Sequence, residues 1–444
     1  MLNQSFRHMQ DVSEGVTPPI EMMALLRCLF PLSRSLTGNG VRDTLHAIGA
    51  HLPVVVHEIP TGTKVFDWEV PKEWNIRGAT IKTMDGKPLV DFAQSNLHVV
   101  GYSIPFSGVL SRDELAEHVH TLPDQPDVIP YRTSYYSENW GFCLPHSLWE
   151  TMRDDSYQVE IDSELAPGHL TYGEFLVPGV TDQEILISVH LCHPSLANDN
   201  LSGIVVAVAL ALHAMKQTPA PLGLRFLFLP ATIGAIAWLA RNEDVLPRVT
   251  HGLVLTCIGD MGPFHYKKSR SPSKIDAIVA HALQHSLHPY EVSDFSPYGY
   301  DERQFGSPGI NLPVGCLMRA VHGTFPEYHT SRDDCDFVTD AALTQSFRLL
   351  CSILHICQNN RLYQRLDGRG EPQLGRRGLY RAIAGQREAG GASQMDLLWV
   401  LNLADGMHSL LEIAERARIP FARADAAARL GLQAYLIKEV EPCL

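Results

Sequence analysis

The chain has 444 residues, more than one hydrophobic core usually serves, so two or three compact units are expected. Its composition, 45% hydrophobic and 19% charged with 33 Gly and 29 Pro, is typical of a globular enzyme and excludes a disordered or fibrous chain. The formal net charge of −13 disfavours binding to nucleic acid or to an anionic membrane surface, because both attract basic patches.

The cysteines and the N-terminal segment indicate the compartment. Nine cysteines are scattered along the chain without a CxxC pair, which indicates free thiols in a reducing compartment. No stretch reaches the roughly 18 apolar residues of a membrane span. The first 17 residues lack a basic segment followed by an apolar run, so no signal peptide is expected. We therefore expect a cytoplasmic protein that does not bind a membrane.

The first part of the chain predicts helices followed by a different kind of sequence. Helices are expected at 21–30 and up to about residue 52, and a short strand at 53–56. From 66 to 140 the chain is dense in Trp, Pro, Asn and Tyr, and short runs such as 97–102 look like strands. We interpret this segment as a small β-rich domain inserted into a larger one.

From about residue 157 to 362, strands and helices alternate. Buried strands are expected at 184–189, 224–229 and 252–257, and helices at 202–215 and 233–241. Such alternation predicts an α/β domain with a mostly parallel central sheet and helices on both faces. Ligands bind at the carboxyl ends of strands in sheets of this kind, and several polar residues fall there.

The C-terminal part predicts a small helical module that resembles a winged helix. Beyond a Gly-rich turn at 385–391, an apolar helix is expected at 395–403. Ser409 and Glu412 have capping-box spacing, and a third helix and a wing follow at 423–432 and 435–440. The predicted domains are an α/β domain (1–65 and 146–365), the β-rich insert (66–145) and the winged-helix-like domain (370–444).

The strongest candidate for chemistry is a metal site at the end of the strand at 184–189. His190 leaves this strand and Asp199 precedes a helix, so an imidazole nitrogen and a carboxylate oxygen can reach one cation. Zinc accepts both ligand types. His329, in a loop after the last strands, is expected as a third ligand, and Asp260, just past a strand end, as a fourth. The alternative is that Asp199 and Asn200 only cap the following helix.

These motifs resemble a known family. The cluster at 190–203, Asp260 and the segment 328–330 resemble the landmarks of co-catalytic zinc aminopeptidases of the bacterial leucyl aminopeptidase type. The chain as a whole more closely resembles bacterial aminopeptidase-like proteins that carry an inserted β-rich domain and a C-terminal winged helix. The closer likeness is carried by the segments 67–76, 95–100, 129–136 and 312–315.

The resemblance implies roles for the four candidate ligands. It makes His190 a ligand of one zinc, Asp199 the bridging carboxylate, Asp260 a terminal ligand and His329 a ligand of the second zinc. It also points to the biosynthesis of a specialised or surface metabolite.

The sequence departs from the aminopeptidase pattern at two places. Ala231 and Thr232 stand where those enzymes have two adjacent Glu, one the general base and one a zinc ligand, and Cys192 stands in place of an Asp. Without that ligand a mononuclear site is expected. Cys192 is interpreted as a small buried residue rather than a thiolate ligand or a nucleophile.

Another group must then take the proton from water, a step that typically contributes roughly 10²–10⁴-fold. The candidates are His193 beside the metal cluster, Glu327 near His329, and the pair Asp301 and Glu302. For Asp301 and Glu302 the alternative is that both are surface polar residues.

Two further features receive non-catalytic interpretations. His281, His285 and His288 mimic metal spacing on one helix but are interpreted as a solvated face. From 366 to 444 there are ten Lys or Arg and ten Asp or Glu, so the C-terminal module lacks a DNA-binding charge pattern. It is interpreted as a packing element or as a surface that binds a partner protein or another copy of the chain.

The sequence thus predicts a zinc-dependent peptidase or amidohydrolase acting on a small amine-bearing or peptide-like substrate. The alternative is a catalytically inactive, metal-stabilised binding or scaffold protein of a biosynthetic pathway. A DNA-binding regulator is disfavoured by the charge of the C-terminal module.

Overall fold

The computed structural model describes residues 15–217, 219–379, 388–389 and 392–440. The chain divides into two compact units by its internal contacts. The larger unit contains 18–273 and 289–347, and the C-terminal unit contains 1–17, 274–288 and 348–444. Most of the Gly-rich turn expected at 385–391 lies outside the described residues.

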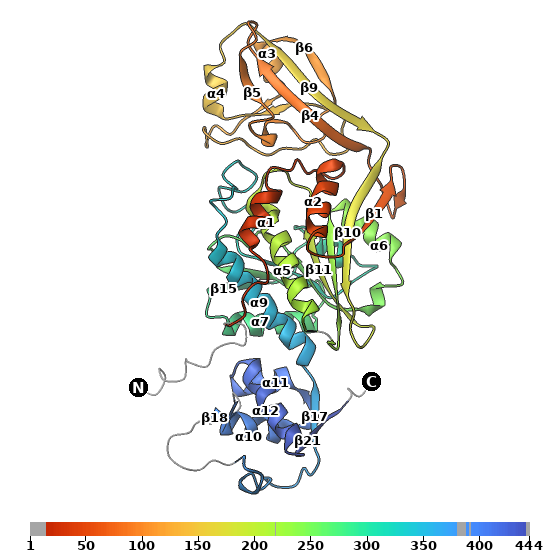
Figure 1. Ribbon diagram of the computed structural model, residues 1–444, viewed down its shortest axis with the longest axis vertical. Helices are drawn as coiled ribbons and strands as arrows, with labels where there is room; N and C mark the ends of the chain where they lie inside the picture. The colour runs from red at the N-terminus through yellow and green to blue at the C-terminus, as the bar shows by residue number, and fades with distance from the viewer. Residues whose placement is uncertain (1–14, 218, 380–387, 390–391, 441–444) are drawn as a thin grey trace, which may run out of the picture. The chain divides into compact units, whose positions relative to one another are not determined.

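The larger unit is built on an eight-stranded mixed sheet (Figure 1). β12, β11, β13 and β16 are parallel neighbours at its centre, and β10 and β14 join this centre by antiparallel pairing. The α/β class is therefore confirmed, with a sheet that is parallel at its centre and mixed towards its edges. In order across the sheet, the strands are β1 (Val55–Pro60), β10 (His169–Val177), β12 (Gly223–Leu229), β11 (Glu184–His190), β13 (Val249–Leu255), β16 (Val314–Met318), β14 (Phe264–Lys267) and β15 (Tyr290–Ser293).

Two connections place helices on opposite faces of this sheet. α5 (Gly203–Met215) connects β11 to β12, and α6 (Ile233–Arg241) connects β12 back across β11 to β13. Because such crossovers are right-handed, connections that run in opposite directions lie on opposite faces. The strand order therefore reverses between β11 and β13, and ligands of α/β sheets bind at the carboxyl ends of strands at such a point.

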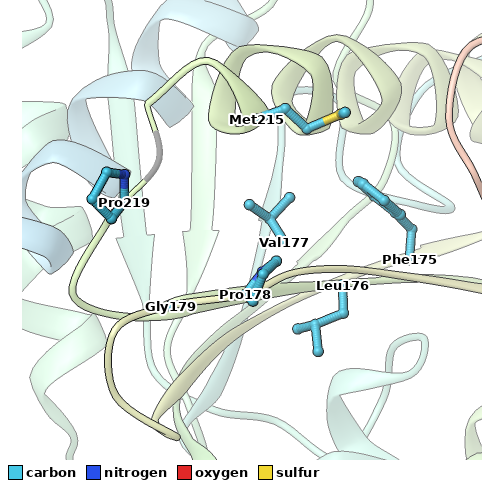
Figure 2. A pocket seen from close by; sticks show the side chains of 7 residues that line it. All are labelled: Phe175, Leu176, Val177, Pro178, Gly179, Met215 and Pro219. Carbon is cyan, nitrogen blue, oxygen red and sulfur yellow. The ribbon is translucent and has the colours of Figure 1, made fainter.

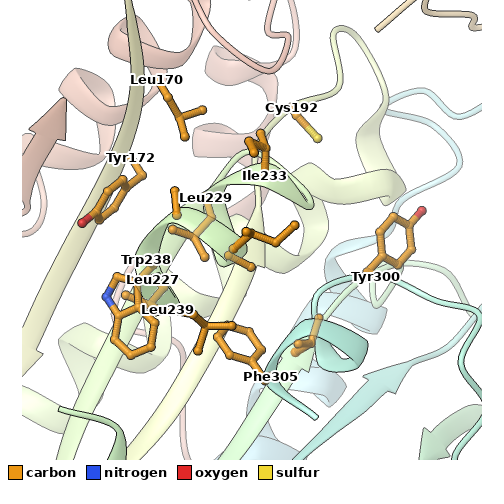
Figure 3. Packing of buried hydrophobic residues seen from close by; sticks show 14 of the residues in the cluster. Leu170, Tyr172, Cys192, Leu227, Leu229, Ile233, Trp238, Leu239, Tyr300 and Phe305 are labelled. Carbon is orange, nitrogen blue, oxygen red and sulfur yellow. The ribbon is translucent and has the colours of Figure 1, made fainter. Parts of the chain in front are cut away.

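The core explains why the central strands are apolar without alternation. Every residue of β11 and β12 is buried, because helices cover both faces of the sheet. On the α6 side, Trp238 packs with Leu227, Leu229 and Phe305 (Figure 3). Among the described residues one helix, Ala197–Met215, has the length and composition of a membrane span, but 83% of that window is buried inside the protein. Packing against β11 and against α1 (Met22–Leu29) explains this composition.

The inserted domain is a four-stranded antiparallel sheet in the order β5-β4-β9-β6. Its strands are β5 (Pro88–Asp91), β4 (Glu73–Lys82), β9 (Ser156–Ala166) and β6 (Phe106–Ser111). The sequence-based boundary at 145 precedes β9, whose buried Tyr157, Val159 and Ile161 complete the core of the insert. The run 97–102 is not a strand, since Asn96–His98 forms a 3-10 helix.

Short elements complete the larger unit. They are α2 (Asn39–Gly49), α3 (Arg112–Ala116), α4 (His146–Thr151), α8 (Glu302–Phe305), the hairpin of β2 (Lys64–Val65) and β3 (Trp68–Glu69), and the pair β7 (Val119–His120) and β8 (Phe142–Cys143).

The C-terminal unit contains the expected winged helix. The capping box predicted at Ser409 and Glu412 is present and opens α11. In contrast to the sequence-based boundaries, 274–288 and 348–365 cluster with this unit rather than with the α/β domain. Its elements include α7 (Lys274–His285), the end of α9 (Asp340–Asn359), α10 (Gln394–Leu403), α11 (Leu410–Ala417), α12 (Phe421–Gln433) and a sheet of β20 (Asp405–Ser409), β17 (Leu362–Arg365) and β21 (Ile437–Val440).

His281 of α7 is buried, so the prediction of a solvated face was wrong for this residue. Only 3% of its surface is exposed, and its Nε2 accepts the backbone N–H of Phe421, 3.0 Å away. Phe421 is the first residue of α12, where backbone N–H groups have no partner within the helix. Burial lowers the pKa of His281 to about 3, so the neutral ring serves as the acceptor.

Candidate metal centre

Ligand-type side chains converge at the carboxyl end of β11. His190 is the last residue of this strand, and Asp199 lies in the buried turn Ala197–Ser202 that leads into α5. Asn200 also acts as a cap, because its Oδ1 accepts the N–H of Gly203, 3.3 Å away. The turn therefore caps the helix and presents Asp199 at the same time.

His190, His193 and Asp199 form one group, with ligand atoms within 4.8 Å of one another. Nε2 of His190 lies 2.9 Å from Oδ1 of Asp199, and Nδ1 of His193 lies 3.6 Å from the same oxygen. The other oxygen, Oδ2, lies 3.1 Å from Nε2 of His329. Three imidazoles thus surround one buried carboxylate.

The spacing of these donors fits a zinc ion. Zinc bonds of about 2.1 Å in tetrahedral geometry place neighbouring donors about 3.4 Å apart, and the distances from Asp199 run from 2.9 to 3.6 Å. Nδ1 of His193 is buried without a hydrogen-bond partner among the described residues, so a bound cation would satisfy it once the ring is neutral. Imidazole and carboxylate donors suit zinc.

Charge also suits a cation at this place. Burial alone would raise the pKa of Asp199, but the charge of His193 and hydrogen bonds with His190 and His329 hold it well below its usual range. Burial lowers the pKa of His329, which favours the neutral imidazole that binds metals.

Further side chains position Asp199. Oδ1 and Oδ2 of Asp333 accept the backbone N–H groups of Asn198 and Asp199 at 2.5 and 2.9 Å. The hydroxyl of Tyr300 donates to Oδ2 of Asp199 at 2.9 Å, and its ring stacks on His190 with centroids 4.5 Å apart. Such outer partners fix the orientation of ligands and tune metal affinity.

Asp260 lies outside this group, in contrast to its expected role as a ligand. Its Oδ1 accepts the N–H of Gly262 at 2.7 Å, and its Oδ2 accepts bonds from Asn198 Nδ2 and the N–H of Ala320 at 3.0 and 3.1 Å. Both oxygens are thus engaged in holding the loops around the site, which the position after a strand does not reveal.

The four candidate proton carriers have different surroundings. His193 belongs to the ligand group, whereas Glu302 is buried in an ion pair with Lys267. Glu327 is half-buried, and its carboxylate makes no hydrogen bond within the described part of the chain. Asp301 is fully buried, so neither it nor Glu302 is a surface residue.

Asp301 is unusual because neither carboxyl oxygen has a hydrogen-bond partner among the described residues. Burial, and secondly the charge of Glu302, raise its pKa to about 8. Burial raises the pKa of Cys192 to about 12, and the charge of Asp301 contributes to this shift. The Cys192 thiol donates to the carbonyl of Ala231 at 3.7 Å, at the place where the paired Glu are missing.

The insert contributes to the site. The ring of Tyr131 stands edge-on to His193 and His329, with centroids 5.1 and 5.0 Å away. Its N–H donates to the carbonyl of His329 at 2.7 Å. The same two segments are also joined at Ile129 and Ser331. The N–H of Ile129 donates to Ser331 Oγ at 3.0 Å, and the N–H of Ser331 donates to the carbonyl of Ile129 at 2.8 Å.

Sequence reasoning missed the site roles of Tyr131, Tyr300 and His322. His322 is buried, its Nδ1 has no hydrogen-bond partner within the described residues, and its ring lies 5.1 Å from that of Tyr300. The aromatic-rich segment 129–136 was the available indication for Tyr131, but sequence alone does not place an inserted domain beside a strand end.

A separate hollow of about 620 Å³ lies at the far end of α5 from the metal centre (Figure 2). It is lined by Phe175 to Gly179, Met215 and Pro219, none of which carries a titratable group. This hollow therefore offers no catalytic chemistry.

Comparison with known proteins agrees with this architecture. Residues 23–360 match the family described as Domain of unknown function (DUF4910). The chain belongs to the DUF4910 family. Residues 361–439 of this DUF4910 chain match a winged helix-turn-helix family. A Clostridium acetobutylicum protein named for polysaccharide biosynthesis and an aminopeptidase-like domain is 46% identical over 421 residues, 95% of this chain and 96% of that protein.

Solved structures confirm the aminopeptidase-like fold. A crystal structure from Clostridium acetobutylicum, described as that of a peptidase, has a TM-score of 0.89 and 44% identity, covering 94% of this chain and 96% of that one. A zinc aminopeptidase from Bacillus subtilis has a TM-score of 0.54 and 12% identity, covering 77% and 96%. The second likeness concerns the fold alone.

Proposed function

We propose that this DUF4910 protein is a zinc-dependent hydrolase that cleaves an amide bond in a small amine-bearing substrate. The observation that carries the proposal is the buried group of His190, His193 and Asp199, with His329 on the second carboxylate oxygen. The zinc aminopeptidase fold supports it. The name of the Clostridium acetobutylicum relative supports a place in polysaccharide biosynthesis.

A single zinc ion would be held by three of the side chains His190, His193, Asp199 and His329, which leaves a fourth position open to water or substrate. When bound, zinc supplies a Lewis acid that polarises the scissile carbonyl and acidifies water. One ion is favoured over two because Ala231 and Thr232 offer no carboxylate and Asp260 is engaged elsewhere.

We assign proton transfer to Asp301. A carboxyl group with a pKa of about 8 can accept and return a proton near neutral pH, whereas one at its usual pKa is a weaker base. Its two unpartnered oxygens leave it free to bond to water or to the substrate amine. His193 is occupied by the ligand role and Glu302 by Lys267.

The first test is the metal content of the purified protein. We expect about one zinc per chain, and we expect it to be lost in His190→Ala and in His329→Ala. It should be kept in His46→Ala, because His46 is an exposed histidine far in sequence from the candidate ligands. Two ions per chain would restore Asp260 as a ligand. The absence of metal would contradict the proposal.

The second test measures whether the zinc-loaded chain releases amines from aminoacyl amides and N-acyl amines. Turnover would distinguish an active hydrolase from a scaffold protein. The replacement of the paired Glu by Ala231 and Thr232 favours that alternative, a metal-stabilised scaffold. Zinc binding without any turnover would support the scaffold.

We further propose that the winged helix binds protein rather than nucleic acid, in the cytoplasm. The two arginines of α12 are paired within the unit: Arg423 contacts Asp396, and Arg429 contacts Asp425. Arginines engaged in this way are not available for phosphates. A fluorescence anisotropy titration with random duplex DNA should show no saturable binding at 150 mM salt, roughly physiological ionic strength.

A further inference from the structure

A line of aromatic side chains leads from the metal centre to the protein surface. It begins at Tyr131, whose ring stands edge-on to His193. The hydroxyls of Tyr131 and Tyr135 lie 3.3 Å apart, and the rings of Tyr135 and Tyr136 are 6.5 Å apart. Tyr136 then meets Trp68, with ring centroids 5.6 Å apart. The line therefore joins the insert, the β2–β3 hairpin and the metal ligands.

The outer end of this line is exposed to solvent. Trp68 and Tyr136 are 46% and 51% exposed, and Phe66, in the turn of the same hairpin, is 53% exposed. Phe66 and Tyr136 also have positive φ angles of 56° and 49°, which are uncommon for bulky residues and occur preferentially at ligand sites. Neighbouring exposed aromatic rings that connect to a buried polar site through further rings are typical of a ligand-binding surface.

The chemistry of this surface favours a ring with an apolar face and polar edges. Trp68 and Tyr136 offer ring faces in an open position, while the hydroxyls of Tyr131 and Tyr135, which bond to each other, lie further in. A pyranose ring matches both, because its C–H groups pack on an aromatic face and its hydroxyls bond to phenols and water. An aliphatic peptide side chain would gain more from an enclosed apolar pocket.

We propose that Trp68 and Tyr136, with Tyr135 and Tyr131 behind them, form the subsite for the sugar ring of an acylamino sugar. The inference rests on the proposed function, because the same molecule would carry, further along than this sugar ring, the amide that the metal centre hydrolyses. Hydrolysis adds the oxygen of water to the carbonyl carbon and breaks the C–N bond. The protons of water pass to the nitrogen and to solvent or Asp301, which leaves a carboxylate and an amino sugar.

The test is binding of N,N′-diacetylchitobiose to the full zinc-loaded chain, measured by isothermal titration calorimetry. We expect saturable binding that weakens about tenfold in Trp68→Ala and in Tyr136→Ala, and less in Trp68→Phe, since one ring contact has about this value. Tyr290→Ala is the matched control, because Tyr290 is similarly exposed on the edge strand β15. Zinc content should be equal in all variants.

Two outcomes would overturn the inference: sugar binding that ignores Trp68, or no sugar binding while N-acetyl-L-leucine amide binds in a Trp68-dependent way. The second outcome would assign the aromatic line to peptide-like substrates. Failure of the proposed function looks different, since the protein would then lack zinc or release no amine whether or not the sugar binds.

Discussion

Replacing Asp301 by Asn should stabilise the protein by an amount that grows with pH. The folded protein holds this carboxyl at a pKa of about 8, against 3.8 for an unperturbed group. Between these values the unfolded chain is ionised at this position and the folded chain is protonated. The folded state of the natural protein therefore loses stability as the pH rises from 3.8 towards 8, whereas Asn does not titrate.

The size of the effect follows from the two pKa values. Each unit corresponds to about 1.4 kcal/mol, so the buried acid costs about 1.7 kcal/mol at pH 5 and about 5 kcal/mol at pH 8. The advantage of Asp301→Asn should thus increase by about 3–4 kcal/mol over this range. The buried amide of the introduced Asn lowers the free energy of unfolding by an amount that is independent of pH.

Urea unfolding at pH 5, 6.5 and 8 measures this difference. Tryptophan fluorescence is a suitable probe, because five of the six tryptophans lie in the larger unit with Asp301 and only Trp399 lies in the C-terminal unit. Asp182→Asn, at an exposed position, is the control. A difference between Asp301→Asn and the natural protein that stays constant with pH would refute the reasoning. Amide turnover should fall by roughly 10²–10⁴-fold in the same variant, so stability and activity move in opposite directions.

Three other changes test the surroundings of the metal centre and the C-terminal unit. Tyr300→Phe removes the donor to Asp199 and should weaken zinc affinity roughly 10–100-fold in a competition with a chelating dye. Asp333→Ala leaves two buried N–H groups without an acceptor and should lower the free energy of unfolding in urea by roughly 3 kcal/mol. His281 is neutral when folded, so α12, which begins at Phe421, should lose protection from hydrogen exchange as the pH falls from 6.5 towards 3; in His281→Gln this pH dependence should disappear.

Each of these changes has a matched control on the same chain. Tyr290→Phe removes an exposed hydroxyl, Asp336→Ala an exposed carboxylate, and His285→Gln the neighbouring histidine of α7. Equal effects in a control and in its test variant would contradict the assigned contact.

Much of the α/β domain was predictable, because its central strands and helices are long apolar runs that local pattern identifies. The helix at 233–241 has the predicted bounds, and β11 differs from its prediction by one residue. β9 was assigned to the wrong side of the insert boundary, since its alternating pattern fits either sheet and only the pairing with β4 decides. Pairing between distant strands is not encoded in local periodicity.

The grouping of the candidate ligands was predictable in part. His190 and Asp199 could be named as candidates because each flanks an element that the sequence reveals, and the structure places them 2.9 Å apart. The different surroundings of His193 and Asp260 could not be predicted, because both residues follow a strand end in the sequence. Only the structure shows that Asp260 is engaged by the N–H groups of Gly262 and Ala320. Similarly, the sequence pattern placed His281 on the solvated face of a helix, because the pattern does not reveal that its Nε2 accepts the N–H of Phe421.

The backbone pairing between Ile129–Tyr131 of the insert and His329–Ser331 has a consequence for the evolution and engineering of this chain. The insert looks like an optional addition to a complete aminopeptidase-like domain, yet it holds the strand-like segment that presents His329. Deleting it would leave His329 without this backbone pairing, so the α/β domain does not hold the whole candidate ligand group by itself. The insert and His329 are therefore expected to be kept or lost together when the chain is altered.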